Sequence, residues 1–396
     1  MSSIPGKKIR VMVVDDSILA RSLIIKGLSA NPRIEVVGYA INTNDARTKF
    51  AKLNPDVMTM DVEMPGMDGI SFLKQFLPDN PVPVILVSSL NLKVFDALSA
   101  GAVDFVRKPE KEGQEAFIET LTQKVITAAS AKVRSSRPAA APAAPPSSAV
   151  KTILAKPSPA KAPADNASAA KAAASSTVAK ASSAAAAANA ILSGTPAASL
   201  GAQSALDNVI IGLGASTGGT EATLEVMKQL PADIPGMVIV QHMPPGFTAM
   251  YAERLNRLCS MEVREAKHGD EIRRGLALVA PADLQARVVR NGNRYTISCT
   301  HGEKVSGHRP SVDVLFRSMA ESVNCKMVGI ILTGMGQDGA DGLLSMRKRG
   351  AYTIGQDEET SVVYGMPMVA HKIGAVVTQA PIDNIAQILL RHLKSL

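Results

Sequence analysis

Tryptophan is absent from the 396-residue chain, and cysteine occurs only three times. Cys259, Cys299 and Cys325 lack the close spacing of metal-ligand pairs, and they do not make a plausible disulfide framework. Neither a cysteine-bound metal nor a disulfide-stabilised secreted domain is therefore expected. We predict that the three thiols are buried and behave as small apolar side chains.

Long apolar runs are also missing from the sequence. No uncharged stretch approaches the roughly 20 residues that a membrane-spanning helix needs, and the start, Met-Ser-Ser-Ile-Pro-Gly-Lys-Lys, has no apolar run typical of a secretion signal. The sequence therefore predicts a soluble, cytoplasmic protein without membrane insertion. Its length is sufficient for two domains, each with its own core.

The net charge of the chain is +8, but neither the part before Lys132 nor the part after Leu206 has a clear excess of basic residues. Lys and Arg number 15 against 15 Asp and Glu up to Ala131, 8 against 1 from Lys132 to Leu206, and 20 against 19 beyond. In the middle part the lysines are scattered among alanines and are not interleaved with aromatic residues. This composition is typical of a solvated tether, so no nucleic-acid partner is expected.

The chain divides into three regions. Residues 7–130 alternate short β-branched runs with amphipathic stretches, which predicts an α/β domain with a doubly wound parallel sheet of the flavodoxin-like order 2-1-3-4-5. Residues 131–206, rich in Ala, Pro, Ser and Lys, bury too little apolar surface to offset the entropy of ordering, which predicts a long flexible linker. Residues 207–396 are again α/β, and we expect a Rossmann-like doubly wound sheet there. The predicted strands are Ile9–Val14, Ile34–Val37, Val57–Met60, Val84–Val87, Asp104–Val106, Val209–Gly212, Met237–Val240, Ala277–Val279 and Met327–Leu332, with a hairpin of Ala286–Arg290 and Arg294–Cys299.

Acidic side chains follow two neighbouring strands of the first predicted sheet. Asp15 and Asp16 come directly after the first strand, and Asp61 comes directly after the third. In the 2-1-3-4-5 order these strands are adjacent, so the three carboxylates converge at one crevice. Clustered carboxylates repel one another unless a hard cation is present, and a few carboxylates with waters suit Mg²⁺.

A hydroxyl and an ammonium group are expected at the same edge. Ser88 ends the fourth strand and Lys108 ends the fifth. This set suits an acyl phosphate on Asp61, with the other two aspartates on the metal and with Lys108 and Ser88 on the phosphoryl oxygens. Any one of these residues alone is more typical of a loop cap or an exposed side chain, but all five at strand ends favour the site.

Four segments of this region, V-V-D-D-S, M-D-V-E-M-P-G-M-D-G, V-S-S and V-R-K-P, resemble the receiver domain of two-component response regulators. The resemblance covers nearly all of residues 7–130. It implies phosphorylation of Asp61 by a partner histidine kinase. It also suggests Phe105 as an aromatic switch residue beside Lys108.

The third region opens with a glycine-rich stretch, Ile210 to Ala222, which reads as the end of a strand, a loop and the start of a helix. We expect four glycines in the loop, and we expect Ser216 at the carboxyl edge of the sheet, where backbone N–H groups and a helix dipole stabilise an anion. The serine could be a nucleophile or part of a phosphate-binding turn. The four glycines are Gly212, Gly214, Gly218 and Gly219.

A nucleophilic serine needs a base, and the base needs an orienting group. His242 directly follows a strong apolar strand and therefore reaches the same sheet edge as Ser216. Asp338 follows another buried strand in a glycine-rich loop, which completes a candidate catalytic triad. The glycines let backbone N–H groups turn toward an oxyanion, and we place the N–H of Thr217 there.

Other interpretations stay open at this point. G-L-G-A-S-T-G is near the dinucleotide pattern G-x-G-x-x-G, but its third glycine is displaced and no acidic residue ends the second strand. His242 alone could be a core histidine, and Asp338 alone a loop cap. His308 could replace His242 as the base, whereas Asp313 is more typical of a helix cap. A dinucleotide-binding oxidoreductase and a non-catalytic signalling adaptor are the alternative functions.

The segments I-G-A-S-T-G-G, Q-H-M-P, H-R-P-S-V-D-V-L-F, L-T-G-M-G-x-D-G and V-V-Y-G-M-P closely resemble the catalytic domain of chemotaxis protein-glutamate methylesterases. The resemblance puts Ser216, His242 and Asp338 on the catalytic triad and Met335 beside Thr217 at the oxyanion. It implies hydrolysis of glutamyl methyl esters on methyl-accepting chemoreceptors, often with deamidation of receptor glutamines, and a chemotaxis histidine kinase as phosphodonor.

Two features depart from that family pattern. The predicted linker is far longer than the usual connector, and A-P-A-D-L-Q-A-R replaces a stretch that usually contains Gly and His. The length of the linker affects how tightly the receiver docks on the catalytic domain. The replaced segment affects the contacts with the receptor. The order of the domains predicts that the unphosphorylated receiver occludes the cleft at Ser216 and that phosphorylation of Asp61 favours an open form.

Overall fold

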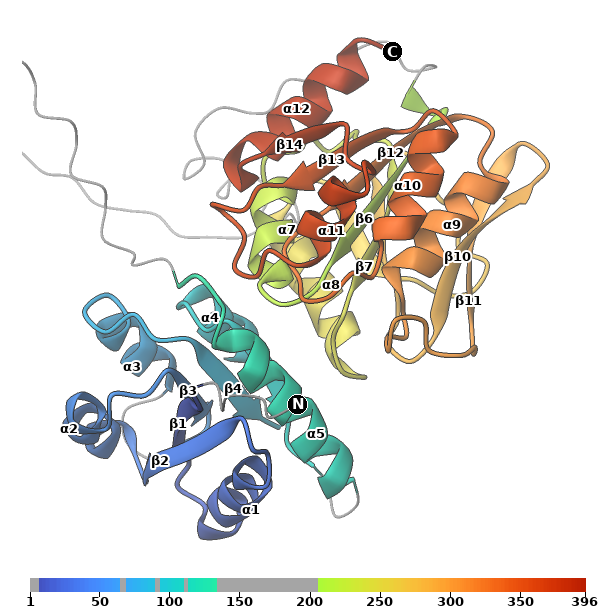
Figure 1. Ribbon diagram of the computed structural model, residues 1–396. Helices are drawn as coiled ribbons and strands as arrows, with labels where there is room; N and C mark the ends of the chain where they lie inside the picture. Colours follow the sequence, from blue (N-terminus) through green and yellow to red (C-terminus); the bar gives the residue numbers. More distant parts are fainter. Residues whose placement is uncertain (1–6, 65–68, 90–92, 110–112, 134–205) are drawn as a thin grey trace, which may run out of the picture. The chain divides into compact units, whose positions relative to one another are not determined.

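The computed structural model describes residues 7–64, 69–89, 93–109, 113–133 and 206–396 (Figure 1). All of them belong to one compact unit of the chain. Residues 134–205, which hold nearly all of the predicted linker, lie outside the described residues, as does the segment 65–68 of the motif after Asp61. In the described part of the chain, no helix is both long and apolar enough to cross a membrane.

The first sheet has five parallel strands in the order β2-β1-β3-β4-β5 within the described residues, which confirms the predicted flavodoxin-like arrangement. The strands are β1 (Ile9–Val14), β2 (Ile34–Ala40), β3 (Val57–Asp61), β4 (Val84–Ser88) and β5 (Asp104–Arg107). The helices are α1 (Ile18–Ser29), α2 (Thr43–Leu53), α3 (Gly69–Phe76), α4 (Lys93–Ser99) and α5 (Gln114–Ala128). Each strand begins where the sequence predicts. β1 also ends as predicted, at Val14, whereas the other four continue for one to three residues, to Ala40, Asp61, Ser88 and Arg107.

Strand register brings the acidic residues of this sheet together. Val14 at the end of β1 lies opposite Met60 of β3, so Asp15 and Asp61 follow side by side. The helix α1 begins soon after β1 because Ser17 caps it, its hydroxyl accepting from the N–H of Ala20 at 3.3 Å. The carboxyl edge of the sheet therefore carries the predicted acidic site.

The second sheet has seven parallel strands in the order β14-β13-β12-β6-β7-β9-β8 within the described residues. Its strands are β6 (Val209–Ala215), β7 (Gly236–Gln241), β8 (Glu262–Glu265), β9 (Leu276–Val279), β12 (Lys326–Ile331), β13 (Tyr352–Gln356) and β14 (Thr378–Ala380). The helices are α7 (Gly219–Met227), α8 (Phe247–Leu258), α9 (Val312–Ser322), α10 (Ala340–Lys348), α11 (Met366–Lys372) and α12 (Ile382–Lys394). Because β7 and β12 flank β6 on opposite sides, the carboxyl end of β6 lies at the topological switch point.

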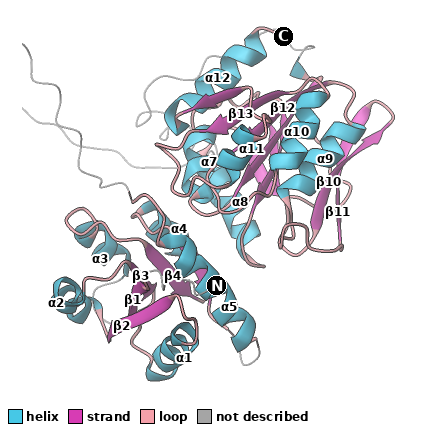
Figure 2. Ribbon diagram, in the orientation of Figure 1, coloured by secondary structure: helices cyan, strands magenta, loops and turns pink. Residues whose placement is uncertain are grey.

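The two faces of the second sheet are covered by different helices (Figure 2). Alternate residues of a strand point to opposite faces. Ile211 and Ile239 pack in a cluster with buried side chains of α7, α8 and α12, whereas Ile210 and Val238 pack with those of α9, α10 and α11. The strands therefore read as continuous apolar runs, as expected for a parallel sheet buried on both faces.

Strand β6 is longer than predicted, and this corrects the expectation of a four-glycine loop. The strand continues to Ala215, so Gly212 and Gly214 lie inside it, only Gly218 belongs to the turn, and Gly219 begins α7. A Cβ atom on Gly214 would lie 2.1 Å from Cγ1 of Val312. The two strand glycines therefore serve the close approach of α9 to the sheet.

Replacement of Gly214 by alanine should destabilise the protein because the new methyl group needs the space that Val312 occupies. Over-packing of this kind typically costs about 1–3 kcal/mol of unfolding free energy. Urea unfolding of the full chain measures the change. Gly302→Ala is the matched control, since its added Cβ would meet its nearest neighbour, Gln285, at 3.3 Å. Equal stability of Gly214→Ala and wild type would contradict this packing.

A two-stranded hairpin is confirmed next to the second sheet. It pairs β10 (Gln285–Asn291) with β11 (Arg294–Thr300) in antiparallel fashion around a turn in which Gly292 has a φ of 62°. The N–H of Val288 donates to the Ser318 hydroxyl of α9 at 2.9 Å. The hairpin is thus attached to the helix that packs on β6.

The cysteines only partly match the prediction. Cys299 is buried, but Cys259 and Cys325 are half-buried. Burial raises the pKa of Cys259 to about 12 and that of Cys299 to about 11, so these thiols stay protonated at neutral pH.

Candidate active site

The turn after β6 is fixed by backbone bonds to the next strands. The N–H of Ser216 donates to the carbonyl of Thr333, which follows β12, at 3.0 Å. The Ser216 carbonyl accepts from the N–H of Gly219 at 2.7 Å as the chain enters α7. A Cβ on Gly334 would come within 2.7 Å of the Ser216 Cβ atom, so the segment after β12 passes directly beside the serine.

One buried amide links the turn of Ser216 to the end of β7. Ala215 lies opposite Gln241 in the strand register, which places Ser216 beside His242. The Gln241 side-chain Nε2 donates to the carbonyl of Ser216 at 2.9 Å and to that of His242 at 3.2 Å. Gln241 has no role that the sequence predicts, because an amide that bonds backbone carbonyls has no sequence signature of its own.

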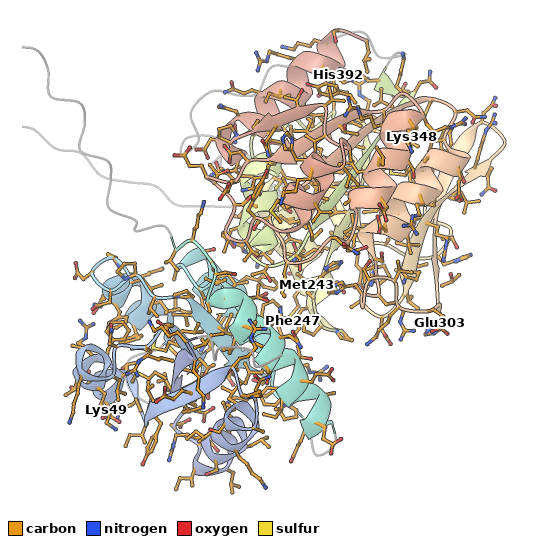
Figure 3. The ribbon with its side chains drawn as sticks, in the orientation of Figure 1. Lys49, Met243, Phe247, Glu303, Lys348 and His392 are labelled. Carbon is orange, nitrogen blue, oxygen red and sulfur yellow. The ribbon has the colours of Figure 1, made fainter. Side chains whose placement is uncertain are left out.

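The imidazole of His242 contacts the carboxylate of Asp338, as expected from their strand ends. Nε2 of the histidine lies 2.9 Å from Oδ2 of the aspartate, and both side chains are largely buried, with exposed fractions of 7% and 1%. The other ring nitrogen, Nδ1, is buried and has no hydrogen-bond partner among the described residues. Figure 3 labels Met243 and Phe247, which follow β7 on the segment that carries this histidine.

The carboxylate of Asp338 accepts three further hydrogen bonds from the start of α9. Ser311 Oγ donates to Oδ1 at 2.6 Å, Val312 N to Oδ2 at 2.7 Å and Asp313 N to Oδ1 at 3.1 Å. Burial would raise the pKa of this carboxyl, but bonds from His242, Ser311 and Val312 and the attraction to His242 outweigh it and lower the pKa. The carboxylate is therefore ionised beside the imidazole.

His308, the alternative base, lies on the face of the His242 ring. The two ring centroids are 3.7 Å apart with an interplanar angle of 9°. Burial, followed by repulsion from a protonated His242, lowers the pKa of His308 to about 4, so this ring is neutral at pH 7. Since Asp338 bonds to His242, the geometry favours His242 as the base.

The two residues expected at an oxyanion flank the serine turn. The backbone N–H groups of Thr217 and Met335 donate to no acceptor within the described residues. The Thr217 hydroxyl donates to Oδ2 of Asp104 at 2.7 Å, and the Thr127 hydroxyl contacts the sulfur of Met335. Both support residues thus touch the first α/β domain inside the compact unit.

The acidic residues of the first sheet come together as predicted. One carboxylate oxygen from each of Asp15, Asp16 and Asp61 lies within 4.8 Å of the others. The Lys108 ammonium lies 2.6 Å from Oδ2 of Asp61 and 3.5 Å from Oδ2 of Asp15. Burial raises the pKa of Asp15, Lys108 opposes this, and the neighbouring carboxylates add to it. The cluster carries the charge and the oxygen ligands that a hard cation needs.

Two atoms near this cluster indicate room for ligands. Oδ2 of Asp15 and the hydroxyl of Ser88 are buried and accept or donate no hydrogen bond among the described residues. A buried carboxylate oxygen that accepts no hydrogen bond, with the Lys108 ammonium 3.5 Å away as a charged neighbour, fits a divalent cation, and a hydroxyl without a hydrogen-bond partner fits a phosphoryl oxygen. Phe105, the predicted switch residue, is buried, with its ring centroid 4.6 Å from that of Phe247.

Comparison with known proteins assigns the two domains. The model of the response regulator receiver domain matches residues 11–119, and that of the CheB methylesterase matches residues 211–389. The chain is 42% identical to the protein-glutamate methylesterase/protein-glutamine glutaminase 2 of Syntrophomonas wolfei subsp. wolfei, over 98% of this chain and 99% of that protein. It is 43% identical to the protein-glutamate methylesterase/protein-glutamine glutaminase of Syntrophotalea carbinolica, over 96% of each.

A third relative has the same span. The protein-glutamate methylesterase/protein-glutamine glutaminase of Sulfurimonas denitrificans is 44% identical, over 95% of this chain and 96% of that protein. These matches run through both domains and through the segment between them. The chain therefore belongs to the CheB methylesterase family, whose members here carry a response regulator receiver domain ahead of the catalytic domain.

Proposed function

We propose that this protein is a protein-glutamate methylesterase that hydrolyses glutamyl methyl esters on chemoreceptors and also deamidates receptor glutamines. The relatives are named for both activities, which supports the proposal. The observation that carries the proposal is the buried His242–Asp338 pair, 2.9 Å apart, at the sheet edge where β6 delivers Ser216. A histidine held by a carboxylate is the base that activates a neighbouring serine for acyl transfer.

In the proposed reaction, His242 takes the hydroxyl proton of Ser216 as its oxygen attacks the ester carbonyl. Because Nε2 is bound to Asp338, Nδ1 is the ring nitrogen that receives the proton. Collapse of the tetrahedral adduct breaks the bond to the methoxy group, which leaves as methanol with the proton from His242. Water then attacks the acyl-serine in the same way and releases the glutamate side chain.

The oxyanion of the adduct is assigned to the backbone N–H groups of Thr217 and Met335. Both groups lack acceptors among the described residues, which supports this role. Each oxyanion donor typically contributes about 10²–10³-fold to the rate. For a glutamine substrate the same steps apply, with ammonia as the leaving group in place of methanol.

The geometry argues against the dinucleotide alternative. Gly212 and Gly214 lie within β6 and face α9, where added Cβ atoms would collide with Met319 and Val312. These glycines are therefore covered by protein and do not line a pyrophosphate-binding turn. Chemoreceptors are the proposed substrates, and a chemotaxis histidine kinase is the proposed phosphodonor, in keeping with the receiver and CheB families.

The receiver domain is proposed to hold Mg²⁺ through Asp15, Asp16 and Asp61, whose oxygens converge. When bound, the ion offsets the negative charge that gathers as a phosphoryl group is transferred. Asp61 is the proposed acceptor of the phosphoryl group. The contact of Lys108 with Asp61 and the unpaired hydroxyl of Ser88 support the proposal that these two side chains hold its oxygens. The proposed domains are 7–130 and 207–396, joined by the linker 131–206.

Contacts between the receiver and the catalytic domain support the proposed occlusion. Asp104, which starts β5, accepts from Thr217 at 2.7 Å and pairs with Lys124 at 2.6 Å. Phe105 follows it and packs against Phe247 of the catalytic domain. Thr217, next to the proposed nucleophile, is thus bound to β5, the strand that precedes Lys108, and we propose that phosphorylation of Asp61 acts on the serine turn through this strand.

Replacement of Asp61 by asparagine should abolish the response to a phosphodonor because the amide cannot form the acyl phosphate. In wild type, acetyl phosphate with Mg²⁺ should raise methanol release by about 5-fold to 150-fold, the range of typical coupling energies. The assay compares methanol release from methylated receptor membranes with and without the phosphodonor. Asp79→Asn, at an exposed position of the same domain, is the control. Stimulation of Asp61→Asn to the wild-type level would rule out this phosphorylation site.

The central test of the proposed enzyme is release of methanol from methylated receptor membranes by the full chain. It is combined with labelling by a fluorophosphonate, which reacts with activated serines. Methanol release and labelling at Ser216 support the esterase. Receptor binding without either reaction would support the non-catalytic adaptor instead.

A further inference from the structure

Helices α9 and α10 exchange carboxylates at their N-termini. Asp338 lies just before α10 and accepts the N–H groups of Val312 and Asp313 in the first turn of α9. In return, Oδ1 of Asp313 accepts the N–H of Gly342 in the first turn of α10 at 2.7 Å. The unpaired N–H groups at the start of each helix thus donate to a carboxylate at the start of the other helix.

This exchange replaces a cap that α10 does not have. The N-cap of α10 is Gly339, whose φ of 90° suits glycine and which offers no side chain to the helix. Asp313 is 3% exposed and supplies the missing acceptor from α9. A Cβ on Gly342 would lie 2.7 Å from that of Phe316, so the two helices approach closely at this point. The position of Asp338 relative to α9 is therefore held by hydrogen bonds at the N-terminus of α9 and at the N-terminus of α10.

Ser311 directs one hydrogen bond at the carboxylate. Its side chain is fully buried, and its N–H is held by Oε1 of Gln285 at 2.9 Å. Its hydroxyl oxygen accepts from Val314 N at 3.4 Å as the cap of α9. The single hydroxyl proton is thereby left for Oδ1 of Asp338, at 2.6 Å.

The two carboxylate oxygens of Asp338 have different hydrogen-bond partners. Oδ1 is taken by Ser311 and by the N–H of Asp313, whereas Oδ2 meets the imidazole of His242 and the N–H of Val312. Rotation of the carboxylate would break all of these bonds together. The plane of the carboxylate, and with it the direction of Nε2 of His242, is consequently set by the start of α9.

We propose that Ser311 is a positioning residue of the catalytic site, and that Asp313 supports it by fixing α10 against α9. The proposal rests on the proposed esterase function. Ser311 acts through Asp338 and His242 and does not touch the substrate. Its loss should therefore lower the rate of the chemical step while leaving substrate binding nearly unchanged.

The test compares three variants of the full chain. Ser311→Ala removes the hydroxyl, Ser311→Thr keeps it, and Ser318→Ala removes another buried hydroxyl of α9 that bonds Val288 N and the Leu315 carbonyl but does not contact Asp338. The measurements are the rate of fluorophosphonate labelling at Ser216 and the kcat and KM of methanol release. Thermal unfolding shows that each variant is folded.

We expect Ser311→Ala to lower kcat and the labelling rate about tenfold to a hundredfold, as a small misplacement of a catalytic group does, with KM within about twofold. Ser311→Thr should recover most of the loss, and Ser318→Ala should match wild type in rate. Asp313→Ala should show a smaller loss than Ser311→Ala, and Asp313→Asn, whose amide oxygen can still accept from Gly342, should retain more activity.

The possible results distinguish failure of the positioning role of Ser311 from failure of the esterase function. A folded Ser311→Ala that is labelled and turns over at the wild-type rate would overturn the positioning role and leave the esterase intact. An equal loss in Ser318→Ala would do the same, because it would trace the effect to general weakening of α9. A wild type that is neither labelled nor active would overturn the esterase and this inference with it.

Discussion

Replacement of Ser216 by alanine is expected to lower methanol release by about 10⁴-fold to 10⁶-fold, the scale on which serine hydrolases lose activity without their nucleophile. The side chain sits at the end of β6, beside His242, and the substitution removes only its oxygen. Its backbone bonds to Thr333 and Gly219 do not involve the hydroxyl, so the turn should stay in place. Methanol release and fluorophosphonate labelling measure the effect.

A matched serine in the same domain provides the control for this experiment. Ser345→Ala removes a hydroxyl of α10 that donates only to the backbone carbonyl of Asp341, at 2.9 Å. It should be labelled and active like wild type. Labelling that persists at full rate in Ser216→Ala would show that another residue is the nucleophile, and undiminished methanol release would contradict the mechanism itself.

Replacement of Asp338 by asparagine is expected to lower kcat about 10⁴-fold, as the equivalent change does in a serine protease triad. An amide cannot stabilise the protonated imidazole of His242, and it turns the ring toward the wrong tautomer. The amide also has a single acceptor oxygen for a place where Ser311, Val312 and Asp313 all donate. At least one buried donor is left unpaired, which costs about 1–3 kcal/mol of stability.

The matched control is Asp341→Asn, three residues further along the chain. Its side chain is 70% exposed and forms an ion pair with Arg317 at 3.5 Å. This variant should keep wild-type stability and kcat. A kcat for Asp338→Asn within tenfold of wild type would remove Asp338 from the mechanism.

The double variant adds a further check. Residues of a triad act as a unit, so Ser216→Ala combined with Asp338→Asn should be no less active than Ser216→Ala alone. Losses that multiply would mean that the two residues act in separate ways. Stability losses, in contrast, should be those of Asp338→Asn, because only that residue carries the buried hydrogen bonds.

The strand ends could be predicted from the sequence because parallel strands have a simple rule. Buried strands are continuous apolar runs, and the polar residue that ends each run lies at the carboxyl edge of the sheet. This rule predicts that Asp15 lies near Asp61 and that His242 lies near Asp338. Both pairs lie together in the structure. Three short strands were missed, because β8, β13 and β14 contain too many polar residues to stand out as apolar runs.

The glycines of β6 show where a local pattern misleads. Glycine is typical of loops, and Gly212 and Gly214 look like part of one in the sequence. Their environment decides otherwise, since α9, about a hundred residues later in the chain, packs against them and needs the space that a Cβ would fill. Nothing near these glycines in the sequence indicates that helix.

The sequence by itself determined the α/β class, the order of the receiver strands and the residues that can do chemistry, because these depend on hydrophobic runs and on the side chains that end them. The tertiary structure alone decided how those residues are held. Gln241 bonds the carbonyls of Ser216 and His242, and Ser311 turns its hydroxyl toward Asp338, through contacts between segments far apart in the chain. A hydrogen bond depends on the distance and direction between two atoms, and only the packing of helices on the sheet sets these.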